Sequence, residues 1–209
     1  MKSGKRTLIQ RAAIPIAFLA LVFAAGYQTR KPGSLDLTII DGTGGRPTPA
    51  RVELMDRDKN PYVADDALPT NGDCLDRPEA ARMPLAQAVG LLTKNLKNPY
   101  TGRTEFYSVG TSNVPSLPAG TYMLRIHKGP EYDIAEREIQ IGAGEQVRVV
   151  VELTRWADLP RTGWYSADGY MHIARPVDGL NPIISKWMQA EDVHVASLLQ
   201  WGNSRVSHN

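Results

Sequence analysis

The amino-acid sequence predicts a mainly β protein, in which a β-sandwich with a helical insertion is followed by a partial βαβ unit. Three observations carry this prediction. Hydrophobic and polar residues alternate with period two in several short segments between residues 35 and 153. Glycine and proline clusters separate those segments, as turns separate strands. From residue 163 onward the pattern changes to strand, helix and strand.

Six segments of the sandwich are predicted to be strands. In the first, Leu35, Leu37 and Ile39 alternate with their neighbours. A glycine-rich break, DGTGG at residues 41–45, separates the first strand from the second, so the two are predicted to form a hairpin-like pair. No Gly-Lys-Ser/Thr follows, so we interpret the break as a turn and not as a phosphate-binding loop. The predicted strands are Leu35–Ile40, Ala50–Met55, Glu105–Val109, Thr121–His127, Glu136–Ile141 and Gln146–Leu153.

A long insertion, residues 59–103, interrupts the sandwich and is rich in proline, asparagine and aspartate. Within it, Leu85, Val89, Leu92 and Leu96 recur at helical spacing. This stripe predicts one helix over residues 84–96, which packs against the core or serves as a lid.

The N-terminus has the layout of a secretory signal. Four basic residues among the first eleven precede a charge-free apolar run, residues 12–25, and polar sequence follows. The run is shorter than the roughly 20 apolar residues of a spanning helix, so cleavage near residues 24–26 is favoured over an uncleaved anchor. Residues 1–26 therefore predict export, with the mature protein periplasmic, extracellular or membrane-anchored outside the cytoplasm. Contact with the membrane is expected only through this segment.

Charge and cysteine content exclude two classes of protein. The first 26 residues hold four of the 24 Lys and Arg and no Asp or Glu, which leaves 20 basic against 22 acidic groups, a net charge of −2. Without a basic stripe, nucleic acid is not an expected partner. The single cysteine, Cys74, excludes an internal disulfide, so the exported chain depends on packing for its stability.

After a short linker, residues 154–162, the composition becomes aromatic and apolar. Trp164–Ile173 is predicted to be a strand, and Asn181 followed by Pro182 predicts an N-cap and a first-turn proline. Apolar residues then recur on one face of a helix, and Val193–Leu199 returns to a strand pattern. A strand, a helix of about ten residues and a second strand predict a parallel pair.

The sandwich region resembles a known family. The segments LDLTIIDGTGGRPTPARVELMD (residues 35–56) and LPAGTYMLRIHKGPEY (residues 117–132) are similar to the carboxypeptidase regulatory-like, transthyretin-like (Ig/transthyretin-like) sandwiches. The resemblance covers residues 35–153. It implies an accessory module without chemistry of its own, which packs beside a hydrolase or binds an extracellular ligand.

The region from residue 163 to residue 209 resembles a second family. GWYSADGYMH, residues 163–172, is similar to the first strand of PHP-type metallohydrolases of the CehA/McbA kind, where the pattern is Gly-Trp-Tyr-Ser-Gly-Asp-x-His-x-His. The resemblance implies the start of an α/β barrel and a divalent metal, zinc or manganese, with His172 as ligand and Asp168 orienting it or sharing the site. Tyr170 stands where the family has its first histidine, and a neutral phenol is a poorer ligand than imidazole. A bound ion would supply a hydrolytic water at neutral pH.

The remaining histidines and tryptophans are assigned structural roles. His194, on the second predicted strand, is interpreted as structural, and Trp164, Trp187 and Trp201 are expected to pack rather than to line a ligand site. Glu131 and Tyr132 match the sandwich family's pattern, and a turn at a domain contact explains them equally well. No Ser/His/Asp or Cys/His combination indicates a catalytic nucleophile elsewhere.

Three functions remain open, and no catalytic residue can be named from the sequence. The first is the exported N-terminal part of a metal-dependent hydrolase, inactive as it stands because the remainder of the hydrolase domain is missing. The alternative is a non-catalytic envelope module whose sandwich binds a carbohydrate, peptide or protein partner, with the C-terminal piece as a packing element. A third, weaker hypothesis is a complementing half that pairs with a separately encoded remainder.

Overall fold

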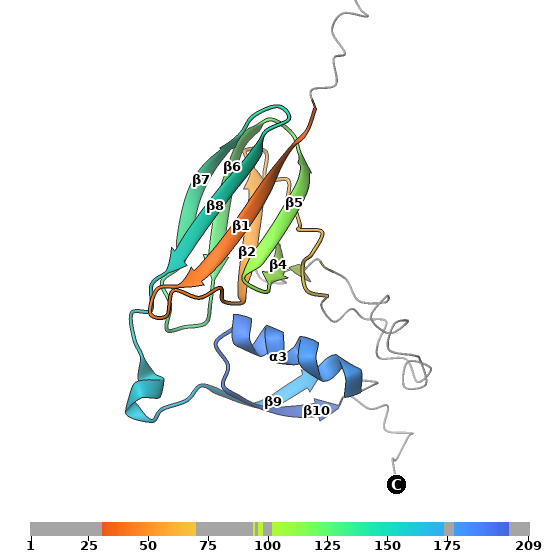
Figure 1. Ribbon diagram of the computed structural model, residues 1–209. Helices are drawn as coiled ribbons and strands as arrows, with labels where there is room; N and C mark the ends of the chain where they lie inside the picture. The colour runs from red at the N-terminus through yellow and green to blue at the C-terminus, as the bar shows by residue number, and fades with distance from the viewer. Residues whose placement is uncertain (1–30, 70–93, 95, 98–101, 174–177, 201–209) are drawn as a thin grey trace, which may run out of the picture. The chain divides into compact units, whose positions relative to one another are not determined.

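The computed structural model describes residues 31–69, 94, 96–97, 102–173 and 178–200. Two sheets form a β-sandwich, one with strand order β5-β1-β8 and the other with order β3-β4-β2-β6-β7 (Figure 1). The sandwich strands are β1 (Gly33–Asp41), β2 (Ala50–Asp56), β3 (Leu96–Lys97), β4 (Thr104–Ser108), β5 (Thr111–Leu117), β6 (Gly120–His127), β7 (Ala135–Ile141) and β8 (Gln146–Leu153). The predicted β-sandwich and the mainly β class are therefore confirmed.

The core lies between the two sheets and is built from alternate residues of their strands. Along β1, every second side chain is buried, beginning with Leu35 and continuing through Leu37 and Ile39. The facing sheet contributes large side chains in the same way, because successive side chains of a strand point to opposite faces. Burying one such side chain stabilises the fold by about 1.5–3 kcal/mol. The other main members of the core are Val52, Leu54, Phe106, Leu117, Tyr122, Leu124, Ile126, Ile139, Ile141, Val149, Val151 and Leu153.

The hairpin-like pairing of the first two strands was a wrong prediction. β1 pairs with β5 in antiparallel and with β8 in parallel orientation, whereas β2 pairs with β4 and β6 in the other sheet. The turn at residues 41–45 is real: the carbonyl of Asp41 accepts from the N–H groups of Gly44 and Gly45, and Gly45 has φ 62°. It carries the chain from one layer to the other instead of reversing it within one sheet.

Two short strands lie where the sequence predicted none. β5 contains Pro115, which weakens the strand pattern but is tolerated because β5 is an edge strand that pairs with β1 alone. Leu96 and Lys97 form β3 and pair with β4, so the last residue of the predicted insertion helix belongs to a strand. The remainder of that helix, residues 84–95, lies outside the described residues except for Lys94, as does Cys74.

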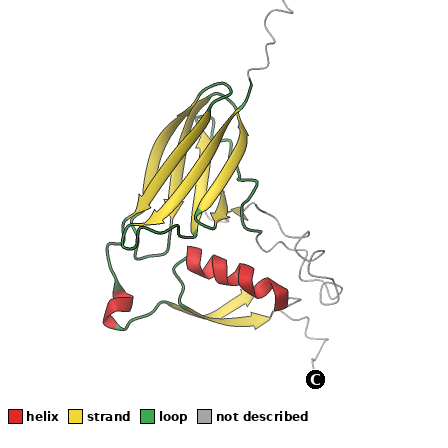
Figure 2. Ribbon diagram, in the orientation of Figure 1, coloured by secondary structure: helices red, strands yellow, loops and turns green. Residues whose placement is uncertain are grey.

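The C-terminal region contains a helix between two parallel strands. β9 (Ala167–Ile173) is followed by the 3-10 turn η4 (Asp178–Leu180), helix α3 (Asn181–Ala190) and β10 (Val195–Gln200); Figure 2 shows the helix beside the two strands. β10 pairs in parallel with β9, from Val195 opposite Ala167 to Gln200 opposite Ile173. The predicted parallel strand-helix-strand order is present, while its likeness to the start of an α/β barrel stays a prediction.

The ends of these elements differ from the prediction. β9 begins at Ala167, because the chain before it forms the 3-10 turn η3 (Leu159–Thr162), which ends at Gly163 with φ 86°. Leu180 occupies the N-cap position of α3, and no side chain caps this end, so Asn181 is not the N-cap. The predicted N-terminal signal, residues 1–26, lies outside the described residues. Among the helices that are described, none has the length and apolar character needed to cross a membrane.

Candidate functional site

A buried cluster of charges joins the sandwich to the end of α3. Arg155, just after β8, donates from Nη1 to Glu131 in the loop between β6 and β7. Its Nη2 donates to both carboxylate oxygens of Asp192, at 2.8 and 3.0 Å. Side chains of all three residues are at least nine-tenths buried. Burial raises the pKa of Asp192, and the charges of Arg155 and Lys128 oppose that shift.

Tyr132 connects this cluster to the first turn of the sandwich. The guanidinium carbon of Arg155 lies 4.3 Å from the centre of the Tyr132 ring, a cation–π distance. The Tyr132 hydroxyl donates to Asp41 Oδ2 at 2.8 Å, and burial with this bond raises the pKa of Tyr132 to about 12. Burial alone would raise the pKa of Asp41, but hydrogen bonds from Thr43 and Tyr132 keep it below its ordinary value. Glu131 and Tyr132 thus belong to a turn at the contact between the two parts.

Lys128 and Gly129, in the same loop, contact the C-terminal end of α3 and the residues after it. The Lys128 ammonium, which is buried, donates to the carbonyl of Pro49 at 2.9 Å and to that of Gln189 in the last turn of the helix. A cation at this end interacts favourably with the helix dipole. Gly129 has φ 57°, and a Cβ there would lie 2.5 Å from Cβ of Asp192. Only glycine fits this close approach.

Glu191 makes a second contact with the outer face of the five-stranded sheet. Its Oε1 accepts from the Tyr107 hydroxyl at 2.8 Å and lies 3.4 Å from Nη1 of Arg51. Arg51 also pairs through Nε with Glu105 at 3.2 Å. Burial raises the pKa of Glu105, and the charge of Arg51 lowers it. Helix α3 is therefore fixed to β2 and β4 by polar contacts as well as to the loop after β6.

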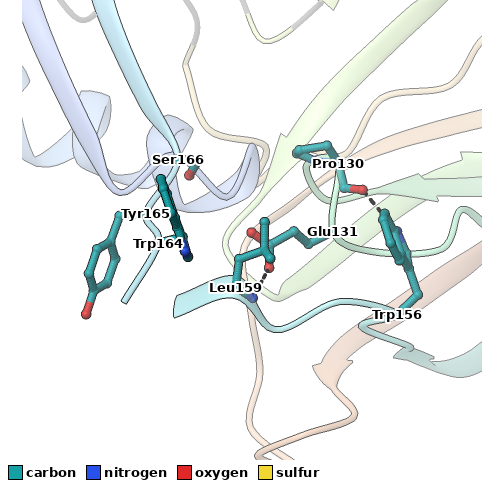
Figure 3. A pocket seen from close by; sticks show the side chains of 7 residues that line it. All are labelled: Pro130, Glu131, Trp156, Leu159, Trp164, Tyr165 and Ser166. Carbon is teal, nitrogen blue, oxygen red and sulfur yellow. Dashed lines mark hydrogen bonds between the residues drawn. The ribbon is translucent and has the colours of Figure 1, made fainter. Parts of the chain in front are cut away.

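An aromatic pocket opens beside the charged cluster. Its volume is about 450 Å³, and Figure 3 shows Trp156 on one side of Leu159 and Glu131 in this view and Trp164 with Tyr165 on the other. Trp156 is 66% exposed, Trp164 72% and Tyr165 60%. Trp164 was predicted to pack, and that prediction is wrong. Trp187 does pack, with its indole N–H donating to the carbonyl of Pro69 at 2.9 Å, and Trp201 lies outside the described residues.

Hydrogen bonds hold the walls of the pocket. The indole N–H of Trp156 donates to the carbonyl of Pro130 at 3.0 Å, and the backbone N–H of Leu159 donates to Glu131 Oε2 at 3.1 Å. The carboxylate of Glu131 therefore binds both Arg155 and the start of η3. The indole N–H of Trp164 and the Tyr165 hydroxyl make no hydrogen bond within the part of the chain that the structure describes.

Ser166 and His194 lie at the edge of the pocket in a pair that the sequence did not reveal. Ser166 Oγ is 2.7 Å from Nδ1 of His194, and the Tyr165 ring meets the imidazole edge-on at 5.6 Å. The serine hydroxyl donates to the backbone carbonyl of Asp192 and accepts from the backbone N–H of His194. The pair joins the residue before β9 to the residue before β10, and the structural role of His194 stays a prediction.

The predicted metal-site residues are only partly described. Asp168 lies on β9, and its Oδ1 accepts from the backbone N–H of Tyr170 at 2.9 Å. Tyr170 is 70% exposed. His172 pairs in register with Leu199, but its side chain is not described. Within the described ranges, no three His, Cys, Asp or Glu side chains gather into a metal-binding group. Of the two predicted ligands, only Asp168 has a described side chain, so no metal chemistry is assigned. The site at His172 and Asp168 stays a prediction.

Comparison with known proteins gives only distant structural similarities. No family model and no curated protein matches the sequence. A minor pilin of Streptococcus agalactiae is 18% identical, with TM-score 0.37 over 60% of this chain and 45% of its own. A group B streptococcus pilus 2b backbone protein is 19% identical, with TM-score 0.38 over 62% of this chain and 43% of its own. The major pilin SpaD from Corynebacterium diphtheriae is 19% identical, with TM-score 0.31 over 60% of this chain and 30% of its own. The chain spans less than half the length of each of these three proteins. At these TM-scores and identities the similarities carry no functional argument.

Proposed function

We propose that the chain is a non-catalytic binding module of an exported protein and that the aromatic pocket holds its partner. The observation that carries the proposal is the exposure of Trp156, Trp164 and Tyr165 around one concavity. Contiguous exposed apolar surface of this kind marks an interaction site in soluble proteins. Tryptophan and tyrosine also contribute most to binding energy in interfaces. Export rests on the basic and apolar pattern of residues 1–26.

The charged cluster supports this proposal because it fixes the pocket walls before a partner binds. Arg155 and Asp192 connect the linker to the chain before β10, and Glu131 connects the linker to the sandwich. A preformed site loses less conformational entropy on binding than a flexible one. The cluster itself has no solvent-exposed group that could react with a substrate.

The test uses the full exported chain and two classes of probe. Decaproline, cellohexaose and chitohexaose are titrated by isothermal titration calorimetry into the wild type and Trp164→Ala. Tyr170→Ala is the matched control, because it removes an exposed aromatic residue that does not line the pocket. Binding of any probe that falls about tenfold in Trp164→Ala and is unchanged in Tyr170→Ala supports the module. Failure of every probe, or equal loss in both variants, contradicts it.

A second candidate is the N-terminal part of a metal-dependent hydrolase. The parallel order of β9 and β10 around α3 favours it, because this is the order in which an α/β barrel begins. The experiment is metal analysis of the purified chain after exposure to zinc or manganese. Stoichiometric metal that is lost in His172→Ala and retained in His208→Ala would support the hydrolase. Equal metal content in all three proteins would contradict it.

A further inference from the structure

Glu131 is the one charged residue among the described residues that line the aromatic pocket. Its side chain is more than nine-tenths buried, and its Oε2 accepts from Arg155 and from the backbone N–H of Leu159. The second oxygen, Oε1, accepts no hydrogen bond from the residues that the structure describes. A carboxylate oxygen that loses water without gaining a donor is destabilised. An occupant that covers Glu131 must therefore bring a hydrogen-bond donor to Oε1.

The buried charges behind this lining do not balance. Arg155 supplies one guanidinium to the two carboxylates of Glu131 and Asp192. Lys128 and Asp41 flank the same cluster and add one charge of each sign. Two cations against three carboxylates leave a net charge of −1 when all five groups are ionised. A neutral occupant would displace water from this charge without compensating it, whereas a cation would compensate it.

The aromatic walls suit a cation as well. The faces of tryptophan and tyrosine rings attract cations through the ring quadrupole. Trp156, Trp164 and Tyr165 are each more than half exposed, so an occupant can reach them. A saccharide can stack on such rings and donate a hydroxyl to Oε1, but it brings no charge. A cationic donor satisfies the aromatic walls and the carboxylate together.

Arg155 shows which cation fits such surroundings. Its guanidinium carbon lies 4.3 Å from the centre of the Tyr132 ring, while its Nη1 donates to Glu131. A planar guanidinium can stack on an aromatic face and donate within its own plane to a carboxylate, and it is more weakly hydrated than an ammonium. A guanidinium in the pocket would repeat this arrangement, with an indole ring as the aromatic face and Oε1 as the acceptor.

We propose that the binding module described above takes an arginine side chain of a partner protein into its aromatic pocket. The guanidinium donates to Oε1 of Glu131 and lies against the indole ring of Trp164. The Trp164 indole N–H and the Tyr165 hydroxyl stay available to the partner's backbone carbonyls. This inference rests on the proposed function, since it names the chemistry of the partner at the same pocket.

The experiment compares three blocked pentapeptides, in which arginine, citrulline or lysine stands between two glycines on each side, using the full exported chain. Citrulline has nearly the shape of arginine but no charge. Calorimetry should detect the arginine peptide, with citrulline weaker by about tenfold or more and lysine weaker several-fold. The arginine peptide also joins decaproline and the two saccharides as a probe of the module.

Variants of the lining locate the contact. Glu131→Gln keeps the shape of the side chain and removes its charge, so it should weaken the arginine peptide about tenfold or more. Asp158→Asn is the matched control, because it removes a negative charge next to Leu159 without changing a lining residue, and it should leave the affinity within about twofold. Trp164→Ala should cost about tenfold and Tyr170→Ala nothing. Thermal unfolding reports the fold of each variant, and the citrulline comparison needs no variant.

The outcomes distinguish the arginine inference from the function on which it rests. Equal binding of the arginine peptide and either of the other two peptides overturns the inference, and so does equal loss in Glu131→Gln and Asp158→Asn. Decaproline or a saccharide that binds and depends on Trp164, while the arginine peptide does not bind, overturns it and leaves the binding module standing. If the arginine peptide, decaproline and both saccharides all fail to bind, both are overturned.

Discussion

Arg155 and Asp192 form an ion pair across 37 positions of sequence, in which Nη2 of Arg155 donates to both carboxylate oxygens, at 2.8 and 3.0 Å. The pair connects the linker to the chain after α3, and Arg155 connects both to Glu131 of the sandwich. Its two members are buried together with Glu131, so one guanidinium compensates two carboxylates.

Removal of this guanidinium is the first prediction. Arg155→Ala leaves Glu131 and Asp192 buried without the guanidinium that pairs with both and should lower the free energy of unfolding by about 3–5 kcal/mol. Urea unfolding measures the change. The control is Arg148→Ala, whose side chain is 82% exposed and 3.8 Å from Asp36; this pair should contribute about 0–1 kcal/mol. Equal losses in the two variants would show that the buried cluster does not stabilise the fold.

The close approach of Gly129 to Asp192 gives a second prediction. Gly129→Ala places a methyl group against Cβ of Asp192 and the carbonyl of Glu191 and also forces a left-handed backbone on alanine. Gly45→Ala is the matched control, because Gly45 has φ 62° and no heavy atom within 4 Å of an added Cβ. We expect Gly129→Ala to cost about 1–3 kcal/mol more than Gly45→Ala in urea unfolding, the range for overpacking. A difference near zero would contradict the steric contact.

His127 predicts how stability depends on pH. Burial lowers its pKa from 6.5 to about 4, and the charges of Arg51, Arg125 and Arg103 act in the same direction while Glu136 opposes them. Below pH 6.5 the unfolded chain binds a proton that the folded chain does not take up until about pH 4. The contribution of His127 is therefore complete above pH 6.5 and is lost as the pH falls toward 4.

His127→Gln tests this dependence because glutamine does not titrate. Urea unfolding at several pH values between 7 and 4 should show the wild type losing more stability than His127→Gln as the pH falls. The difference between the two proteins isolates His127 from carboxylates that titrate in the same range, among them Glu105. Parallel profiles would mean that the pKa of His127 is the same in the folded and unfolded chains.

Much of the sandwich follows from the sequence, because alternation reports which face of a strand is buried. Leu35, Leu37 and Ile39 were predicted to share one face, and all three are buried. The sheet to which each strand belongs does not follow, since the turn at residues 41–45 has the same residues whether it closes a hairpin or crosses between layers. Pairing is decided by contacts between distant segments, such as β1 with β8.

The candidate site was harder to predict than the fold. For Glu131 and Tyr132 the sequence left open the family pattern and a turn at a domain contact, and nothing near Arg155 or Asp192 marks those two as partners 37 positions apart. Trp164 was expected to pack rather than to line a ligand site, because a large aromatic side chain more often serves packing. The exposure of Trp164 depends on η3, which turns the chain before β9. No periodic pattern in the sequence predicts this turn.

The contact between Tyr107 and Glu191 gives the last prediction, because it can be measured as a pairwise energy. The Tyr107 hydroxyl donates to a carboxylate oxygen at 2.8 Å, and a hydrogen bond to a charged group contributes about 1.5–3 kcal/mol. Tyr107→Phe should therefore lower the free energy of unfolding by about that amount. Glu191→Ala also removes the pair with Arg51, so only a double-mutant cycle of Tyr107→Phe and Glu191→Ala isolates the hydrogen bond. Strictly additive losses would mean that the two side chains do not interact in solution. A coupling of about 1 kcal/mol or more would place Glu191 on the outer face of the sheet, as the docking of α3 requires.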